Sequence, residues 1–144
     1  MHKYLSVRDT MTRLPVAVGL NTLVSDCARI MLKEDVGSLI IEENNILKGI
    51  VTEKDLVNKI IARGEDPKKT KVKDIMEKNL VTIDPNKDII EAIRIMSAND
   101  LRRLPVIEND NLVGLLTLKD ILRVQPELFD IVLEKSRFLR SRNV

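Results

Sequence analysis

GIVTEKDL, residues 49–56, recurs sixty-five positions later as GLLTLKDI, residues 114–121, with glycine, threonine, lysine and aspartate at the same spacing. The repeat extends beyond this phrase, because residues 7–57 align with residues 72–122 without a gap. VRDTM matches VKDIM, ARIM matches IRIM, and EEN matches IEN. A constant offset through apolar, turn and polar positions alike indicates that one supersecondary unit occurs twice.

Both copies show the same order of strand and helix patterns. PVAV (15–18) and LVTI (80–83) are short β-rich runs, and Asn21 or Asn86 then precedes a helical pattern as its predicted N-cap. Two apolar runs separated by Asn- and Asp-rich residues predict a β-hairpin, and a second helix begins at the repeated phrase. The predicted order in each copy is therefore β-α-β-β-α. The apolar positions of the first helix are Leu23, Cys27, Ile30 and Met31 in one copy and Ile89, Ala92, Ile93 and Met96 in the other.

The chain length suits two such copies in one compact protein. With 144 residues, 44% of them hydrophobic, the chain can bury one good core but is too short for two large independent domains. Each sheet would expose one face if its copy folded alone, so we expect the copies to pack sheet to sheet about a pseudo-twofold axis. The predicted fold is α/β (α+β), with a first copy over residues 1–64, a linker over 65–71, a second copy over 72–125 and a C-terminal amphipathic helix over 126–144.

The composition excludes several classes of function. A net charge of +2 with interspersed signs does not favour bulk electrostatic binding to nucleic acid or to an anionic membrane. No apolar run approaches the length of a membrane span and the start of the chain lacks a signal-peptide pattern, so we expect a cytoplasmic protein. Cys27 is the only cysteine and His2 the only histidine, which excludes disulfides and zinc clusters. We expect Cys27 to lie in the core. We also expect that the protein is not an enzyme, because candidates for a base and a nucleophile do not occur together.

The repeated phrase itself allows two chemical interpretations. Thr52 and Thr117 fall at predicted helix starts, with Asp55 and Asp120 three residues further on. One interpretation is a capping box, in which the threonine accepts a backbone N–H and the aspartate returns a hydrogen bond. The other is a nucleotide site, because helix N-termini bind phosphate and a carboxylate can accept hydrogen bonds from the vicinal hydroxyls of ribose.

Taken together, these motifs resemble a tandem pair of CBS (cystathionine β-synthase) domains, often called a Bateman module. The resemblance covers residues 5–124 and rests on VRDTMT and VKDIME, ARIM and IRIM, GSLIIEENNILKGIVTEKD and RRLPVIENDNLVGLLTLKD. It implies a non-catalytic regulatory, energy-sensing module that binds an adenosine nucleotide in clefts between the CBS motifs. AMP, ADP or ATP is the implied ligand, with S-adenosylmethionine and NADH as alternatives and no metal. It also implies a homodimer that signals in trans to an unidentified partner protein.

The resemblance implies crossed sites, in which the Thr–Asp pair of one copy is closed by the opposite copy. The second copy offers two arginines where the first has glycine and serine, so we expect unequal affinities, unless the arginines are solvated or paired with Glu108 or Asp110. Glu53 after Thr52 would disfavour a triphosphate in the first site. The first site comprises Ile50, Thr52, Lys54, Asp55, Leu80, Val81, Arg102, Arg103 and Pro105. The second comprises Pro15, Val16, Gly37, Ser38, Ile40, Leu115, Thr117, Lys119 and Asp120.

Residues 126–144 lie outside the repeat and predict an amphipathic helix with Pro126 at its first position. This helix either docks on the module or a dimer interface, or serves as an arm that binds a partner or nucleic acid. The alternative function is thus a nucleic-acid-binding or scaffold CBS protein, although aromatic residues at 2% argue against base stacking. The stripe of the predicted helix is Leu128, Ile131, Val132, Lys135, Phe138 and Leu139, and the basic end of the helix is Arg137, Arg140 and Arg142.

Overall fold

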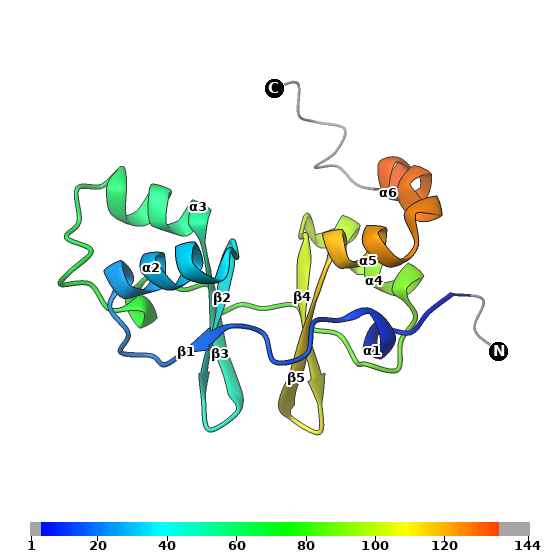
Figure 1. Cartoon of the computed structure of the whole chain (residues 1–144), viewed down its shortest axis with the longest axis horizontal. Coiled ribbons are helices and arrows are strands. Elements are labelled where there is room, and N and C mark those ends of the chain that lie inside the picture. The colour runs from blue at the N-terminus through cyan, green and yellow to red at the C-terminus, as the bar shows by residue number, and fades with distance from the viewer. Residues whose placement is uncertain (1–3, 136–144) are drawn as a thin grey trace. The chain divides into compact units, whose positions relative to one another are not determined.

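The computed structural model describes residues 4–135, and it describes side chains for residues 4–132. The chain divides into two compact units, which we name after the copy of the repeat that each contains. The first-repeat unit is Pro15–Leu80, and the second-repeat unit combines residues 4–14 with residues 81–135. Each unit joins short strands to helices, as the α/β prediction requires (Figure 1).

The first-repeat unit is a three-stranded sheet covered by helices. Strand β1 runs parallel to β2, and β2 runs antiparallel to β3. Alternate residues of the sheet, Leu39, Ile41 and Val51, share one core cluster with Val24, Cys27 and Met31 of α2. The elements are β1 (Ala17–Val18), α2 (Val24–Glu34), β2 (Ser38–Glu43), β3 (Ile46–Thr52), α3 (Glu53–Asp55), the π-helix η1 (Leu56–Ile61) and the 3₁₀-helix η2 (Val72–Asp74).

The second-repeat unit has a two-stranded antiparallel sheet, β4 with β5, which is joined to helices. Leu104, Val106 and Leu116 point from this sheet into a core that also contains Ile89, Ile93 and Met96 of α4. The elements are α1 (Val7–Thr10), α4 (Ile89–Asn99), β4 (Arg103–Glu108), β5 (Asn111–Thr117), α5 (Leu118–Val124), the 3₁₀-helix η3 (Pro126–Leu128) and α6 (Phe129–Lys135).

The two predicted hairpins are confirmed, and their turns explain the Asn- and Asp-rich sequences. Asn44 and Asn45 have φ of 52° and 64°, and Asn109 and Asp110 have φ of 51° and 66°. Positive φ at both central residues is the signature of the tight hairpin turn whose twist matches that of the strands, and Asn and Asp tolerate it better than other residues with a Cβ.

The amino-terminal segments of the two copies are exchanged between the units. Residues 7–12 begin the first copy of the repeat, yet α1 packs against α4, α5 and β5 of the second-repeat unit (Figure 1). Thr12 exchanges two backbone hydrogen bonds with Leu115, at 2.8 and 3.0 Å. In the first-repeat unit, Glu77 exchanges two with Ile50, at 2.9 and 3.1 Å. Each glycine-bearing strand is therefore edged by a segment that belongs to the other copy.

The predicted helix caps at Asn21 and Asn86 are wrong. Helix α4 is capped by Asp88, whose side chain accepts from the backbone N–H of Glu91 at 2.9 Å. Helix α2 has no side-chain cap, because Val24 N–H donates to the carbonyl of Thr70 at 2.9 Å and Ser25 N–H to the carbonyl of Pro67 at 2.9 Å. These distant carbonyls satisfy the free N–H groups that a cap would otherwise serve.

The strand predicted over residues 80–83 does not form. Only Ile83 makes a bridge there, to Val106, whereas the equivalent run in the first copy gives a two-residue strand at Ala17–Val18. Pro85 follows two positions later and has no N–H with which to extend a ladder.

The C-terminal helix begins with Pro126 in its first turn, as predicted, but the turn is 3₁₀ and α6 follows it. Leu128 and Val132 are buried in the core of the second-repeat unit, so the described part of this segment docks on that unit. The predicted positions 137–142, like His2, lie outside the described residues. No helix in the part of the chain that the structure describes is long and apolar enough to cross a membrane.

Candidate functional site

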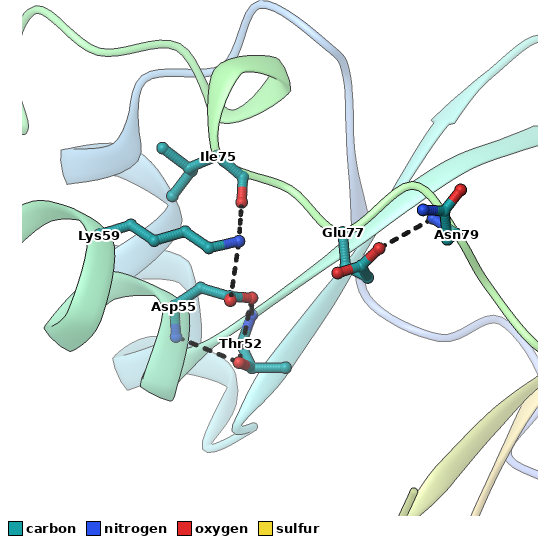
Figure 2. A network of polar contacts seen from close by, with 6 residues as sticks. All are labelled: Thr52, Asp55, Lys59, Ile75, Glu77 and Asn79. Carbon is teal, nitrogen blue, oxygen red and sulfur yellow. Dashed lines mark hydrogen bonds and ion pairs between the residues drawn. The ribbon is translucent and has the colours of Figure 1, made fainter. Parts of the chain in front are cut away.

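Thr52 ends β3 and caps the helix that follows it. Its Oγ1 accepts from the backbone N–H of Asp55 at 3.2 Å. Asp55 Oδ2 in turn accepts from the backbone N–H of Thr52 at 2.9 Å and from its hydroxyl at 3.1 Å (Figure 2). The capping box predicted for this pair is thus confirmed, and it holds the carboxylate at a fixed place beside the helix start.

The other oxygen of Asp55 meets a lysine. Lys59 Nζ lies 3.2 Å from Asp55 Oδ1 and donates to the backbone carbonyl of Ile75 at 2.7 Å. Figure 2 shows the Lys59 side chain reaching between these two acceptors. Because the side chains of Asp55 and Lys59 are only 18% and 32% exposed, this ion pair is shielded from bulk water on most sides. Both oxygens of Asp55 are therefore engaged.

The pair in the second-repeat unit repeats the capping box but not the ion pair. The N–H of Asp120 donates to Thr117 Oγ1 at 3.0 Å, and the N–H of Thr117 donates to Asp120 Oδ2 at 3.1 Å. The hydroxyl of Thr12, from the exchanged segment, reaches the same Oδ2 at 3.4 Å. Val124 stands where the first copy has Lys59, and among the described residues no hydrogen bond or ion pair reaches Asp120 Oδ1.

A carboxylate of α3 lies beside the strand start next to the first pair. Ser38 lies opposite Thr52 in the sheet, and the N–H of Glu53 donates to the carbonyl of Gly37 at 3.1 Å. Glu53 Oε1 lies 3.2 Å from the point that a Cβ at Gly37 would occupy, so a carboxylate fills the space left by this glycine. Ile40 lies opposite Ile50, and its N–H donates to the carbonyl of Val16 at 3.0 Å.

The equivalent strand starts beside the second pair are basic. Arg103 lies opposite Thr117 in the sheet, and Pro105 lies opposite Leu115. The N–H of Leu118 donates to the carbonyl of Arg102 at 2.8 Å, which is the counterpart of the Glu53–Gly37 contact. The arginines thus begin the strand that pairs with the end of β5, in the same unit as Thr117 and Asp120. Glu108, one of their predicted partners, forms an ion pair with Arg8.

Each predicted crossed site is divided between the two units. Of the first site, the first-repeat unit contains Ile50, Thr52, Lys54, Asp55 and Leu80, and the second-repeat unit contains Val81, Arg102, Arg103 and Pro105. Of the second, the first-repeat unit contains Pro15, Val16, Gly37, Ser38 and Ile40, and the second-repeat unit contains Leu115, Thr117, Lys119 and Asp120. What the structure brings together within a unit is each Thr–Asp pair and the strand starts of its own copy.

Sequence reasoning missed three groups beside the aspartates: Lys59, the Ile75 carbonyl and Thr12. Lys59 was detectable, because a lysine four residues after an aspartate on a helix is a standard ion-pair spacing. Thr12 was not, since it lies 108 residues from Asp120 and reaches it only through the segment exchange.

Among the described residues, neither the cysteine nor a cluster of metal-ligating side chains forms a competing site. Cys27 is fully buried in the core, as predicted. Its burial, and to a smaller extent the nearby Asp26 carboxylate, raises the pKa of its thiol from 9.0 to about 11. A neutral buried thiol is a poor nucleophile. Within residues 4–132, no three His, Cys, Asp or Glu side chains are grouped so that they could hold a metal ion.

A duplicated α-β-β-α unit with a Thr-Xaa-Xaa-Asp capping box at each second helix defines the class of this protein. The CBS domain family model matches residues 7–62 and again residues 72–127, and the chain belongs to this family as a tandem CBS pair. The resemblance seen in the repeated motifs is thereby confirmed.

Similar proteins include both curated relatives and solved structures. The chain is 34% identical over 116 residues to the CBS domain-containing protein YhcV of Bacillus subtilis, covering 81% of this chain and 82% of that protein. A hexameric CBS-CP12 protein from bloom-forming cyanobacteria is 32% identical with a TM-score of 0.75, covering 84% of this chain and 68% of that one. The CBS domain pair of protein MJ0100, in complex with 5′-methylthioadenosine and S-adenosyl-L-methionine, is 25% identical with a TM-score of 0.76, covering 86% and 98%.

Proposed function

We propose that this chain is a non-catalytic regulatory module that binds an adenosine nucleotide and signals to a partner protein in trans. The observation that carries the proposal is the capping box that recurs at two strand ends, Thr52–Asp55 and Thr117–Asp120. Each box presents a fixed carboxylate, which can accept hydrogen bonds from the vicinal hydroxyls of ribose. The MJ0100 pair, which has the same fold and binds two adenosine-containing molecules, supports this class of ligand.

The proposed clefts lie between the two CBS motifs, so that each Thr–Asp pair is closed by the opposite copy. Support comes from the alternation of β2, in which Leu39 and Ile41 belong to the core of their own unit while Ile40 and its partner Ile50 do not. Both faces of this sheet are therefore apolar, and the second face requires a cover. Packing sheet to sheet would provide it and would leave apolar walls, including Leu80 and Val81, for an adenine ring.

The phosphate end of the ligand is proposed to interact with the arginines at the start of β4. Arg102 is exposed, and a guanidinium makes charge-assisted hydrogen bonds to phosphate oxygens that contribute about 1.5–3 kcal/mol each. The first copy has glycine and serine at these positions, so one site should bind the nucleotide more tightly than the other site. Substitution of Arg102 or Arg103 by alanine is expected to reduce AMP affinity about tenfold in one site and to leave the other unchanged.

Association of two chains into a homodimer is also proposed, and light scattering after gel filtration tests it. The cyanobacterial relative is a hexamer, so a six-chain assembly is the specific alternative to be measured. In either assembly, a nucleotide would act by stabilising one arrangement of the CBS motifs that a partner protein recognises.

The proposal is tested by thermal shift and calorimetry with AMP, ADP, ATP, S-adenosylmethionine and NADH. GMP and short RNA serve as controls for base identity and for charge. A ligand at about a hundred times its Kd adds about 2.7 kcal/mol of stability, which is easily seen as a rise in Tm. We expect this rise to disappear when Asp55→Asn and Asp120→Asn are combined, because the asparagine oxygen can still accept the N–H of the capping threonine but lacks the charge that ribose hydroxyls favour. If no adenosine compound raises Tm, or if the double variant responds like the wild type, the proposed function is wrong.

A further inference from the structure

We propose that Lys59 closes the first Thr–Asp pair to a ribose diol, so that the second pair, Thr117–Asp120, is the receptor that fills first. This inference rests on the proposed function, because it concerns which of two proposed ribose receptors is open. It assigns the difference between them to one side chain, Lys59, and to the valine that replaces it at position 124.

Asp55 has too few free acceptor sites for a sugar diol. A carboxylate offers about four lone-pair positions, and a sugar diol needs two of them. Asp55 Oδ2 already accepts two hydrogen bonds from Thr52, and Oδ1 faces the Lys59 ammonium at 3.2 Å. Three of the four positions are therefore taken, and a diol, which needs two, must displace either the ammonium from Oδ1 or a Thr52 hydrogen bond from Oδ2.

Lys59 is held in place from its other side as well. Its ammonium donates to the Ile75 carbonyl at 2.7 Å, and only 32% of its side chain is exposed. Lys59 also lies on the π-helix η1, which begins immediately after Asp55, whereas the equivalent α5 is an ordinary α-helix. Helical turns of this rare kind often mark functional positions. The ammonium is thus fixed between two acceptors (Figure 2).

Asp120 lacks such a cation. Val124 cannot form an ion pair, and among the described residues nothing donates to Asp120 Oδ1. The only side chain that reaches this carboxylate within the described part of the chain, apart from its own capping box, is Thr12, whose hydroxyl lies at 3.4 Å. This distance is long for a hydrogen bond between oxygens, so the contact is weak. A diol can therefore approach Asp120 without first removing a cation.

A separate observation favours the same pair at the phosphate end. Beside the first pair, the Glu53 carboxylate occupies the space above Gly37, which opposes an anionic ligand. Beside the second pair, the residue at the position of Glu53 is Leu118, which carries no charge. The two differences, at the sugar and at the phosphate, point to the same receptor.

The experiment exchanges the two side chains and measures AMP binding by calorimetry. Lys59→Val and Val124→Lys swap the residues of the two copies, and Lys59→Met keeps the aliphatic stem in case valine disturbs the π-helix. In the wild type we expect one strong event that Asp120→Asn removes and Asp55→Asn leaves within about twofold. Lys59→Met should tighten the weaker event, at Thr52–Asp55, about tenfold or more. Val124→Lys should weaken the strong event, at Thr117–Asp120, by about ten- to hundredfold, as expected for one charge-assisted hydrogen bond.

The outcomes separate this inference from the proposed function. If the wild type binds AMP but Asp55→Asn removes the strong event, or if both Lys59 variants leave the two affinities unchanged, Lys59 does not close the first pair and the proposed function still stands. If none of the proteins binds AMP, both ideas are wrong. Circular dichroism verifies that each variant is folded. A ¹H–¹⁵N spectrum of the lysine ammonium groups should show a protected Lys59 signal that Asp55→Asn abolishes, and its absence in the wild type would also overturn the inference.

Discussion

Substitution of Gly49 or Gly114 by alanine should separate the exchanged segment from the strand that it edges. A Cβ at Gly49 would lie 2.7 Å from Met76 Sδ and 2.9 Å from the carbonyl oxygen of Glu77. A Cβ at Gly114 would lie 2.5 Å from Met11 Sδ and 2.9 Å from the carbonyl oxygen of Thr12. The methionine can rotate away, but the backbone oxygen is held by the two hydrogen bonds of the bridge. The added methyl therefore has to move the segment itself.

The cost follows from these contacts. Adding one methyl to a well-packed region costs about 1–3 kcal/mol. If the segment moves far enough to break the bridge, its two hydrogen bonds contribute a similar loss, at about 0.5–1.5 kcal/mol each. Because these are alternative ways to relieve one clash, we expect about 1–3 kcal/mol for either substitution rather than the sum. Gly19→Ala is the matched control, since a Cβ there meets no atom within 4 Å, and it should change stability by less than about 1 kcal/mol.

Urea unfolding gives the free energies, and amide hydrogen exchange locates the damage. Gly114→Ala should lower the protection of the Thr12 and Leu115 amides, and Gly49→Ala that of the Ile50 and Glu77 amides, each leaving the other pair protected. If both alanine variants are as stable as Gly19→Ala, or if protection falls evenly over the whole chain, the close approach of the exchanged segments does not explain these glycines.

Three further predictions concern stability. Asp88→Ala should cost about 0.5–2 kcal/mol in urea unfolding because it removes the cap of α4, whereas Asn86→Ala should cost less than about 0.5 kcal/mol. A double-mutant cycle on Arg8 and Glu108 should give a coupling below about 1 kcal/mol that falls with added salt, since both side chains are about a third exposed; a larger, salt-independent coupling would contradict this. The pKa of Cys27 is raised from 9.0 to about 11 by burial, so the folded state keeps a proton that the unfolded state releases. The free energy of unfolding should therefore fall as pH rises from about 9 to about 11, and the fall should be smaller in Cys27→Ala, which lacks the group.

The parts of the fold that depend on local pattern could be predicted from the sequence. The Asn–Asn and Asn–Asp turns require positive φ, which few residues tolerate, and this predicted both hairpins. The Thr-Xaa-Xaa-Asp spacing predicted both capping boxes because their hydrogen bonds join residues only three positions apart.

One of the wrong predictions, the cap at Asn21, depended on groups far away in the chain. Asn21 looked like a cap, but α2 is served by the carbonyls of Pro67 and Thr70, more than forty residues later. The neighbours of the aspartates divide in the same way: Lys59 is one helical turn from Asp55, whereas Ile75 and Thr12 arrive from other segments. No periodicity reports which distant backbone will reach a free N–H or a carboxylate.

The segment exchange explains why methionine and glycine recur together at the same offset. Met11 and Met76 start their copies, and Gly49 and Gly114 lie near the end of theirs, yet each methionine contacts the glycine of the other copy. A glycine is needed wherever another backbone approaches this closely. The two ends of one sequence repeat are thus complementary, but only across copies. A chain cut to residues 65–144 would keep the whole second copy and still lose Met11 and Thr12 from its own compact unit. The repeat is therefore the unit of sequence, whereas the unit of folding requires both copies.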